Sequence, residues 1–222
     1  MKKVAKKAVR ESYLSSQDIE LAFEGLAIKV EKAKRTYLDI AEIKKWKAVH
    51  FNEGLLHLER DRDLFLFQIY TGYYYGDLLV FTMDYLQSDE EFGNVIVGAR
   101  DKNGNQTINP LFKFPHAEYI LRKYGSSNAQ NSVIDAKFII EEPVYNRHFE
   151  EIAKMAGINK NVPNKVARHT NGQLWIRFGA EGAILSKMMG HTKQETTKSY
   201  YDINLPEIVE GTKRADFEVL GI

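Results

Sequence analysis

Three short segments between residues 167 and 200 carry side chains that can do covalent or anion chemistry. Arg168-His169-Thr170 falls in a stretch with helical periodicity, His191 follows Arg168 by 23 residues, and Tyr200 follows His191 by nine. Guanidinium and imidazole groups donate hydrogen bonds to anionic oxygens. A tyrosine hydroxyl is a nucleophile when its surroundings activate it. Together, these segments can bind an anion and supply a nucleophile.

Other common kinds of reactive site have no signature in this sequence. We find no glycine-rich phosphate loop, paired-histidine metal motif or serine elbow. The 222 residues include no cysteine, which excludes disulfides, thiolate metal ligands and a cysteine nucleophile. We therefore expect neither a cofactor nor a bound metal.

Each candidate also has a purely structural interpretation. Tyr200 is one of twelve tyrosines and can simply pack. Lys102, beside Asn103-Gly104, is equally well read as a solvated turn lysine. Arg168 can form an ordinary ion pair, but Leu174 and Trp175 nearby indicate a core-facing helix, where an unpaired guanidinium is costly. The fixed spacing of the set favours function.

Length and composition indicate one globular domain, or one domain with a small appendage. Apolar residues make up 44% of the chain and charged residues 27%. No window reaches the roughly 18 consecutive apolar residues of a membrane helix. The basic start at Met1–Arg10 lacks the apolar centre of a signal peptide. We expect a cytoplasmic protein without a membrane segment.

Local signals predict a mainly helical fold. Val4, Ala8 and Val9, interleaved at helical spacing with five basic residues, favour a helix near the N-terminus, and residues 16–34 are interpreted as a connector. Asp39 and Glu42 form a capping box that opens a helix carrying Ile40, Ile43, Trp46 and Val49. Further helices are expected at about 60–72, 115–125, 143–157, 165–178 and 181–189, and a loop at 126–132.

Two features complete this prediction. Val95-Ile96-Val97 and Thr107-Ile108 flank an Asn-Gly pair, which is typical of a tight two-residue hairpin turn. Thr192 and Glu195 form a second capping box, which predicts a short helix carrying Tyr200. The fold class is therefore mainly α with a small antiparallel β-sheet (α+β).

Charge is unevenly distributed although the net charge is only +1. Residues 53–91 hold nine acidic residues against two arginines, a net −7. Residues 154–199 hold eight lysines and arginines against two glutamates, a net +6. A solvated face explains such a run most simply, and a surface for a polyanion is the alternative.

The motifs resemble, in order and spacing, the catalytic domain of tyrosine recombinases, the phage-integrase family. The resemblance extends from about Lys34 to Asn204, and the Arg-His-Thr, Gly-His-Thr and tyrosine combination is its most specific part. The matching segments are Thr71-Gly72, Asp77-Leu78-Leu79, Lys102-Asn103-Gly104, Ala167-Arg168-His169-Thr170, Met189-Gly190-His191-Thr192, Thr196-Thr197 and Tyr200.

This resemblance implies a metal-free and cofactor-free DNA strand transfer. Tyr200 would attack a phosphodiester and form a 3′-phosphotyrosyl link. Arg168 would hold one phosphate oxygen through its planar fork, and His191 would donate a further hydrogen bond. Lys102 would protonate the leaving 5′ oxygen. These groups would stabilise charge that builds up on the phosphate in the transition state.

The chain departs from the family pattern at two site positions. Tyr74 stands two residues after Thr71-Gly72, where the family has its first phosphate-binding arginine. Lys165 stands three residues before Arg168, where the family usually has histidine. Losing a cationic contact to the phosphate costs on the order of 3 kcal/mol, or about a hundredfold in rate. An ammonium at 165 can still contact phosphate.

The resemblance also implies domains and partners. Residues 1–33 would be the last helix and linker of a preceding core-binding domain, 34–204 the catalytic domain and 205–222 a C-terminal tail. The tail would pack on a neighbouring protomer or back on its own chain. The implied partners are double-stranded DNA, a tetramer of protomers on it and accessory DNA-bending proteins.

Three functional hypotheses remain open from the sequence. The first is a recombinase that integrates or excises a mobile element. The second is a cleavage-impaired DNA-binding or regulatory homologue, as Tyr74 permits. The third is a helical protein-interaction module with coincidental spacing. Covalent trapping separates the first from the second, and salt-sensitive duplex binding separates both from the third.

Overall fold

The computed structural model describes residues 2–13, 15–23, 36–81, 83–102, 104–125, 141–190, 205–216 and 221. The chain divides into two compact units, Met1–Lys34 and Arg35–Ile222. The first unit holds α1 (Lys2–Arg10) and α2 (Ser16–Phe23). The connector predicted for residues 16–34 is therefore wrong at its start. Ser15 caps α2, because its hydroxyl accepts from the Asp18 N–H while the Asp18 carboxylate accepts from the Ser15 N–H.

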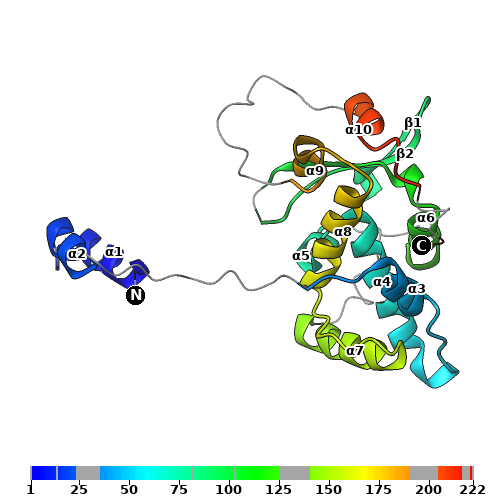
Figure 1. Ribbon diagram of the computed structural model, residues 1–222, viewed down its shortest axis with the longest axis horizontal. Coiled ribbons are helices and arrows are strands. Elements are labelled where there is room, and N and C mark those ends of the chain that lie inside the picture. Colours follow the sequence, from blue (N-terminus) through cyan, green and yellow to red (C-terminus); the bar gives the residue numbers. More distant parts are fainter. Residues whose placement is uncertain are drawn as a thin grey trace. The chain divides into compact units, whose positions relative to one another are not determined.

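The second unit is mainly helical with one three-stranded antiparallel sheet, so the predicted fold class is confirmed (Figure 1). The strands are β1 (Leu86–Asp89), β2 (Gly93–Ala99) and β3 (Gln106–Asn109), in that order. Three 3₁₀ turns lie at Glu53–Leu55, Met83–Tyr85 and Leu111–Lys113. The helices are α3 (Ile40–Lys47), α4 (Leu56–Thr71), α5 (Tyr75–Leu79), α6 (Pro115–Tyr124), α7 (Glu142–Met155), α8 (Lys165–Arg177), α9 (Gly182–Met188) and α10 (Leu205–Gly211).

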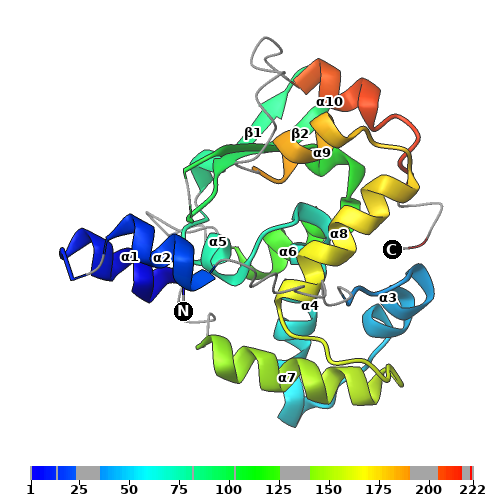
Figure 2. The ribbon, with the colours of Figure 1, turned by 60° about the vertical axis from the view of Figure 1, so that its left-hand side comes forward.

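Helix α4 is the centre of the core. Its residues from Asp61 to Thr71 are almost all buried, and it packs against α3, α6, α7 and α8 (Figure 2). The rings of Trp46, Phe65 and Phe149 meet in this core at centroid distances of 4.6 to 5.8 Å. Because this part of α4 is buried, it fixes the positions of the helices packed on it. One of them is α8, which contains Arg168.

Most predicted helix ends are confirmed, but two are wrong: α4 begins at Leu56 rather than near residue 60, and α3 ends at Lys47, before Val49. The Asp39–Glu42 capping box is present with both reciprocal hydrogen bonds. Gly72 ends α4 in the left-handed conformation, with φ of 72°. Gly190 follows α9 with φ of 58°. The predicted loop at 126–132, the capping box of Thr192 and Glu195 and the helix carrying Tyr200 lie outside the described residues.

The hairpin between β2 and β3 is confirmed, but its turn is longer than two residues. Ala99 pairs with Gln106, and the Arg100 N–H donates to the Asn105 oxygen at 2.9 Å. The Gly104 N–H donates back to the Arg100 oxygen at 2.8 Å. Four residues therefore lie between Arg100 and Asn105. The Asp77 carboxylate accepts a hydrogen bond from the Asp101 N–H within this turn, at 3.0 Å.

The described part of the C-terminal tail packs on its own chain. Helix α10 lies against α9, Ile208 is fully buried, and a Cβ at Gly211 would come within 2.8 Å of Ile184. Of the two alternatives for the tail, residues 205–216 follow the one in cis. None of the described helices is both long and apolar enough to span a membrane.

Candidate active site

Arg168 points from α8 to the ends of two other helices. Its side chain is almost fully buried, with 3% of the residue exposed. One terminal nitrogen donates to the Gly72 oxygen at 2.8 Å, the other to the Met189 oxygen at 2.5 Å. Gly72 ends α4 and Met189 ends α9, so both acceptors carry the partial negative charge of a helix C-terminus. Among the described residues its hydrogen-bond partners are carbonyls, which sets aside the ion-pair interpretation.

The Thr71-Gly72 segment fixes how α8 lies on α4. The Asn171 amide donates to the oxygens of Ile69 and Tyr70 at 2.8 and 3.0 Å. A Cβ at Gly72 would come within 2.8 Å of the Asn171 side-chain oxygen, so only glycine permits this contact. The contact sets the position of Arg168, which lies one turn before Asn171 on α8.

Tyr74 is half-buried and its ring lies beside two guanidinium groups. The Arg168 and Arg100 guanidinium carbons are 5.0 and 5.1 Å from its ring centroid, within cation–π range. The Tyr74 N–H donates to the Asp77 carboxylate at 2.8 Å, which fixes the start of α5. The departure at position 74 thus puts an aromatic ring where the family pattern has a cation.

Arg100 is the site residue that the sequence analysis missed. It follows β2 directly, is 5% exposed, and its Nε donates to the Asp77 carboxylate at 3.0 Å. A second nitrogen donates to the Met189 oxygen at 3.1 Å, the same atom that Arg168 binds. A signal existed, because alternation along β2 puts residue 100 on the buried face that Ile96 occupies. An arginine in that register predicts a buried cation.

Lys102 and Lys165 lie together in an open hollow on one side of Tyr74. Both are exposed, Lys102 in the β2–β3 turn and Lys165 at the start of α8. The hollow has a volume of about 410 Å³, and Arg100 and Tyr74 also line it. A second hollow of about 510 Å³ is lined by Tyr74, Arg168 and the half-buried His169. Of the six predicted site residues, the structure thus places three, Lys102, Lys165 and Arg168, in the hollows lined by a fourth, Tyr74.

His191 and Tyr200 lie outside the described residues. The last described residue before them is Gly190, which packs on the hairpin. A Cβ there would come within 2.6 Å of the Arg100 Cγ and 2.9 Å of the Thr107 methyl carbon. The chain therefore leaves α9 against Arg100, immediately before His191 in the sequence.

The charged side chains that line the two hollows sum to one net positive charge: Arg100, Lys102, Lys165 and Arg168 against Asp77, Asp101 and Glu142. Burial, and then the charge of Arg100, lower the pKa of Arg168 to about 10, so Arg168 still carries its proton at neutral pH. Of the two guanidinium groups, Arg100 is bound to the buried carboxylate of Asp77, whereas the hydrogen-bond partners of Arg168 among the described residues are carbonyls. In the same part of the chain no cluster of three or more His, Asp or Glu side chains could hold a metal ion. The arrangement is suited to an anion.

Comparisons with known proteins agree with this geometry. The tyrosine recombinase XerA of Saccharolobus solfataricus is 25% identical over 171 residues, 75% of this chain and 55% of that protein. The chain thus spans about half the length of this curated relative.

Two solved structures share the fold. The integrase from mycobacterium phage Brujita has a TM-score of 0.61 at 14% identity, covering 85% of this chain and 60% of that one. A lambda integrase (75–356) dimer bound to a COC′ core site has a TM-score of 0.60 at 14% identity, covering 90% and 72%. The predicted tyrosine recombinase catalytic-domain fold is confirmed.

The family model described as "Phage integrase family" matches residues 49–206. This range contains Tyr74, Lys102, Lys165, Arg168, His191 and Tyr200, which are all the predicted site positions. Since the match covers more than half of the sequence, the chain belongs to the phage integrase family.

Proposed function

We propose that this chain is the catalytic part of a site-specific DNA recombinase that integrates or excises a mobile element. Residues 34–204 form the catalytic domain, 1–33 belong to a preceding DNA-clamping domain, and 205–222 are a tail. Membership of the phage integrase family and the buried, carbonyl-bound Arg168 beside an open hollow support this proposal. The single observation that carries it is the placement of Arg168.

The reaction proceeds by direct displacement at phosphorus. The Tyr200 hydroxyl passes its proton to solvent water and its oxygen forms a bond to the phosphorus, while the bond from phosphorus to the 5′ oxygen breaks. Lys102 gives a proton to that leaving oxygen, which becomes a free 5′ hydroxyl. The same type of hydroxyl on a second DNA end reverses the step and rejoins the strands. No water, metal or nucleotide is consumed.

The cations around Tyr74 account for most of the rate enhancement in this scheme. A pentacoordinate phosphate carries more negative charge on its non-bridging oxygens than the diester does, so fixed donors stabilise the transition state more than the substrate. Arg168 is held by two carbonyls and is therefore oriented before DNA binds. Lys165, exposed at the edge of the neighbouring hollow, adds a further cation.

The partners follow from the same scheme. Double-stranded DNA is the substrate, a tetramer of protomers holds two duplexes, and accessory proteins bend the DNA, in the cytoplasm of the host. The lambda integrase dimer bound to a core site and the Tn1549 transposon integrase in complex with circular intermediate DNA share this fold and support a duplex substrate.

Covalent trapping tests the proposal. The full chain is incubated with nicked duplexes that span the ends of the element encoding it, and the products are separated under denaturing conditions. We expect a slowly migrating protein–DNA band that is abolished in Tyr200→Phe and retained in the matched control Tyr201→Phe. Loss of the band in both variants or in neither would contradict the assignment of Tyr200.

A cleavage-impaired DNA-binding homologue is the second candidate, favoured by the ring at position 74. In that case the chain binds the duplexes with a strong dependence on salt and forms no covalent band. A band that emerges only in Tyr74→Arg would assign the defect to this position.

A further inference from the structure

Arg100 and Arg168 reach the same point from opposite sides of the site. Arg100 comes from the end of β2 and Arg168 from α8, and both donate to the Met189 oxygen, at 3.1 and 2.5 Å. Hydrogen-bonded atoms lie within about 3 Å of one another, so the two donor nitrogens are at most about 6 Å apart. A phosphate group is small enough to be bound by both guanidinium groups at this spacing.

The charge at this point is unbalanced. Asp77 neutralises one of the two guanidinium groups among the described residues, and the remaining partners are neutral: the Gly72 and Met189 carbonyls and the Tyr74 ring. Two buried like charges repel one another, and each loses hydration energy. A bound diester carries one negative charge and would remove this excess.

Arg100 is as accessible as Arg168. The two residues are 5% and 3% exposed, and each lines one of the two hollows that meet at Tyr74. Arg100 shares its hollow with Lys102, the proposed general acid. Tyr74, the lining residue common to both hollows, therefore has Arg100 and Lys102 in one hollow and Arg168 in the other.

The Arg100 side chain is held at two points, its Cγ and its Nε. Gly190 has no Cβ, and adding one would bring it within 2.6 Å of the Arg100 Cγ. Asp77 fixes the other end, because its carboxylate accepts from the Arg100 Nε and from the Asp101 N–H, both at 3.0 Å. The guanidinium is therefore oriented before any ligand arrives.

We propose that Arg100, entering from β2, supplies the second guanidinium that binds the scissile phosphate, in place of the arginine that the family pattern has at position 74. This inference rests on the proposed function and names a catalytic residue for it. Tyr74 then has a supporting role: its ring lies within cation–π distance of both guanidinium groups and helps to hold them in place.

The first test compares rates of covalent complex formation on the nicked duplex in a single turnover. We expect Arg100→Gln to be slower than wild type by about a hundredfold or more, with Arg100→Lys in between. Arg62→Gln removes a partly buried arginine that pairs with Asp63 and lines neither hollow, and it is the matched control, with an unchanged rate for the folded fraction. A rate for Arg100→Gln within threefold of wild type would overturn the proposal.

Two rescue experiments separate phosphate binding from a structural role. The double variant Arg100→Gln/Tyr74→Arg should recover at least a tenth of the wild-type rate, because the second arginine returns by the other route. A duplex with a neutral methylphosphonate at the scissile position needs less positive charge, so the defect of Arg100→Gln should shrink to about tenfold or less. A defect that neither change reduces would mean that Arg100 only supports the fold.

Duplex binding decides the matter if the wild-type chain does not cleave. In the Tyr200→Phe background, the plot of log affinity against log salt has a negative slope. Arg100→Gln should make this slope about one less negative, as expected for one lost phosphate contact. An unchanged slope would overturn the role of Arg100 even where the chain is a recombinase. A wild-type chain that binds duplex but yields no covalent band would overturn the cleavage proposal alone, and one that binds no duplex would overturn both.

Discussion

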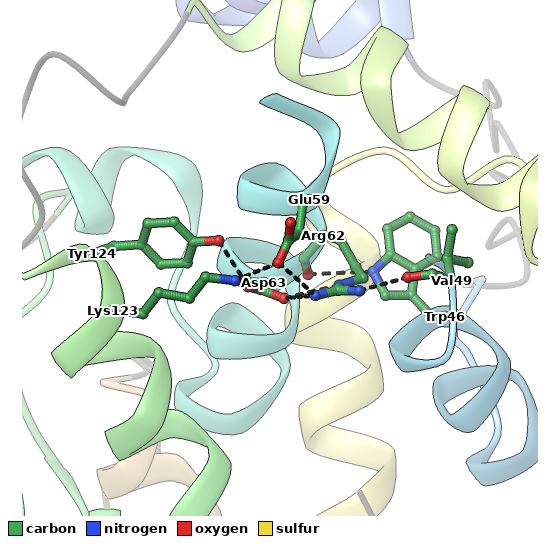
Figure 3. A network of polar contacts seen from close by, with 7 residues as sticks. All are labelled: Trp46, Val49, Glu59, Arg62, Asp63, Lys123 and Tyr124. Carbon is green, nitrogen blue, oxygen red and sulfur yellow. Dashed lines mark hydrogen bonds and ion pairs between the residues drawn. The ribbon is translucent and has the colours of Figure 1, made fainter. Parts of the chain in front are cut away.

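Two charge clusters in this molecule, each built around a buried carboxylate, differ in how they are balanced. Around Asp63, two acids and two cations meet: Asp63 and Glu59 with Arg62 and Lys123 (Figure 3). The Tyr124 hydroxyl donates to Asp63 at 2.8 Å, and the Val49 oxygen accepts from Arg62 at 2.6 Å. Around Met189, two guanidinium groups meet one carboxylate.

The difference indicates what each cluster is for. A cluster with as many negative as positive charges needs no ligand. Asp63, on α4, is 1% exposed and accepts hydrogen bonds from Lys123 and Tyr124 of α6. The guanidinium pair lines two open hollows and keeps one positive charge in excess. Buried charge alone is therefore a poor guide to function, whereas unbalanced charge beside a hollow predicts a ligand of opposite sign.

Removing Arg168 should have the largest effect on activity. We expect Arg168→Gln to slow formation of the Tyr200–DNA complex by about a thousandfold, because a pre-oriented cation is lost from the transition state. Its melting temperature should stay within about 3 °C of wild type, since the loss of two hydrogen bonds is offset by relief of repulsion from Arg100. Single-turnover trapping and thermal unfolding measure the two quantities. A rate within tenfold of wild type would refute the role of Arg168.

Breaking the balanced cluster around Asp63 should lower the stability and leave the trapping rate unchanged. Asp63→Asn leaves Lys123 and Arg62 without their shared carboxylate, and we expect the free energy of unfolding to fall by about 2 kcal/mol, lowering the melting temperature by about 4–8 °C. The trapping rate of the folded protein should not change. The exposed Asp84→Asn is the control for simple loss of an acid. If Asp63→Asn unfolds like wild type, the cluster does not stabilise the fold.

The helices could be predicted because their signals are local. The Asp39–Glu42 capping box and the glycine after α4 need only neighbouring residues to act, and both are observed. Strand β1 and the short helix α5 were missed, because β1 is defined by its pairing with β2 and α5 starts on the Asp77 carboxylate. Such contacts are not written in local periodicity.

The site could be predicted in part for the same reason. Family motifs identified Arg168, Lys102 and Lys165, which the structure brings close to Tyr74. The convergence of Arg100 with Arg168 depends on α9 delivering the Met189 oxygen between them, a contact across 89 and 21 residues of sequence. Because side chains along β2 alternate between its two faces, Arg100 shares a face with Ile96, but only the packed structure shows the partner of Arg100.

The smallest expected effect is a pH dependence next to the balanced cluster. His116 stacks on Tyr119, and its buried Nε2 has no hydrogen-bond partner among the described residues. Burial, and then the charge of Lys47, lower the pKa of His116 to about 4, against the opposing effect of Asp63. The folded state therefore disfavours protonation. The stability that this residue contributes is present above its unfolded pKa of about 6.5 and is lost as pH falls toward 4.

Because His116 is only partly buried, we expect a loss of about 1 kcal/mol between pH 7 and pH 5 rather than the full linkage value. His116→Phe keeps the stacking on Tyr119 and cannot titrate, so its free energy of unfolding should fall less over the same range. Chemical denaturation at several pH values measures both proteins. Equal slopes would mean that His116 is hydrated in the folded state, and the balanced cluster would then be more open to solvent than its hydrogen bonds indicate.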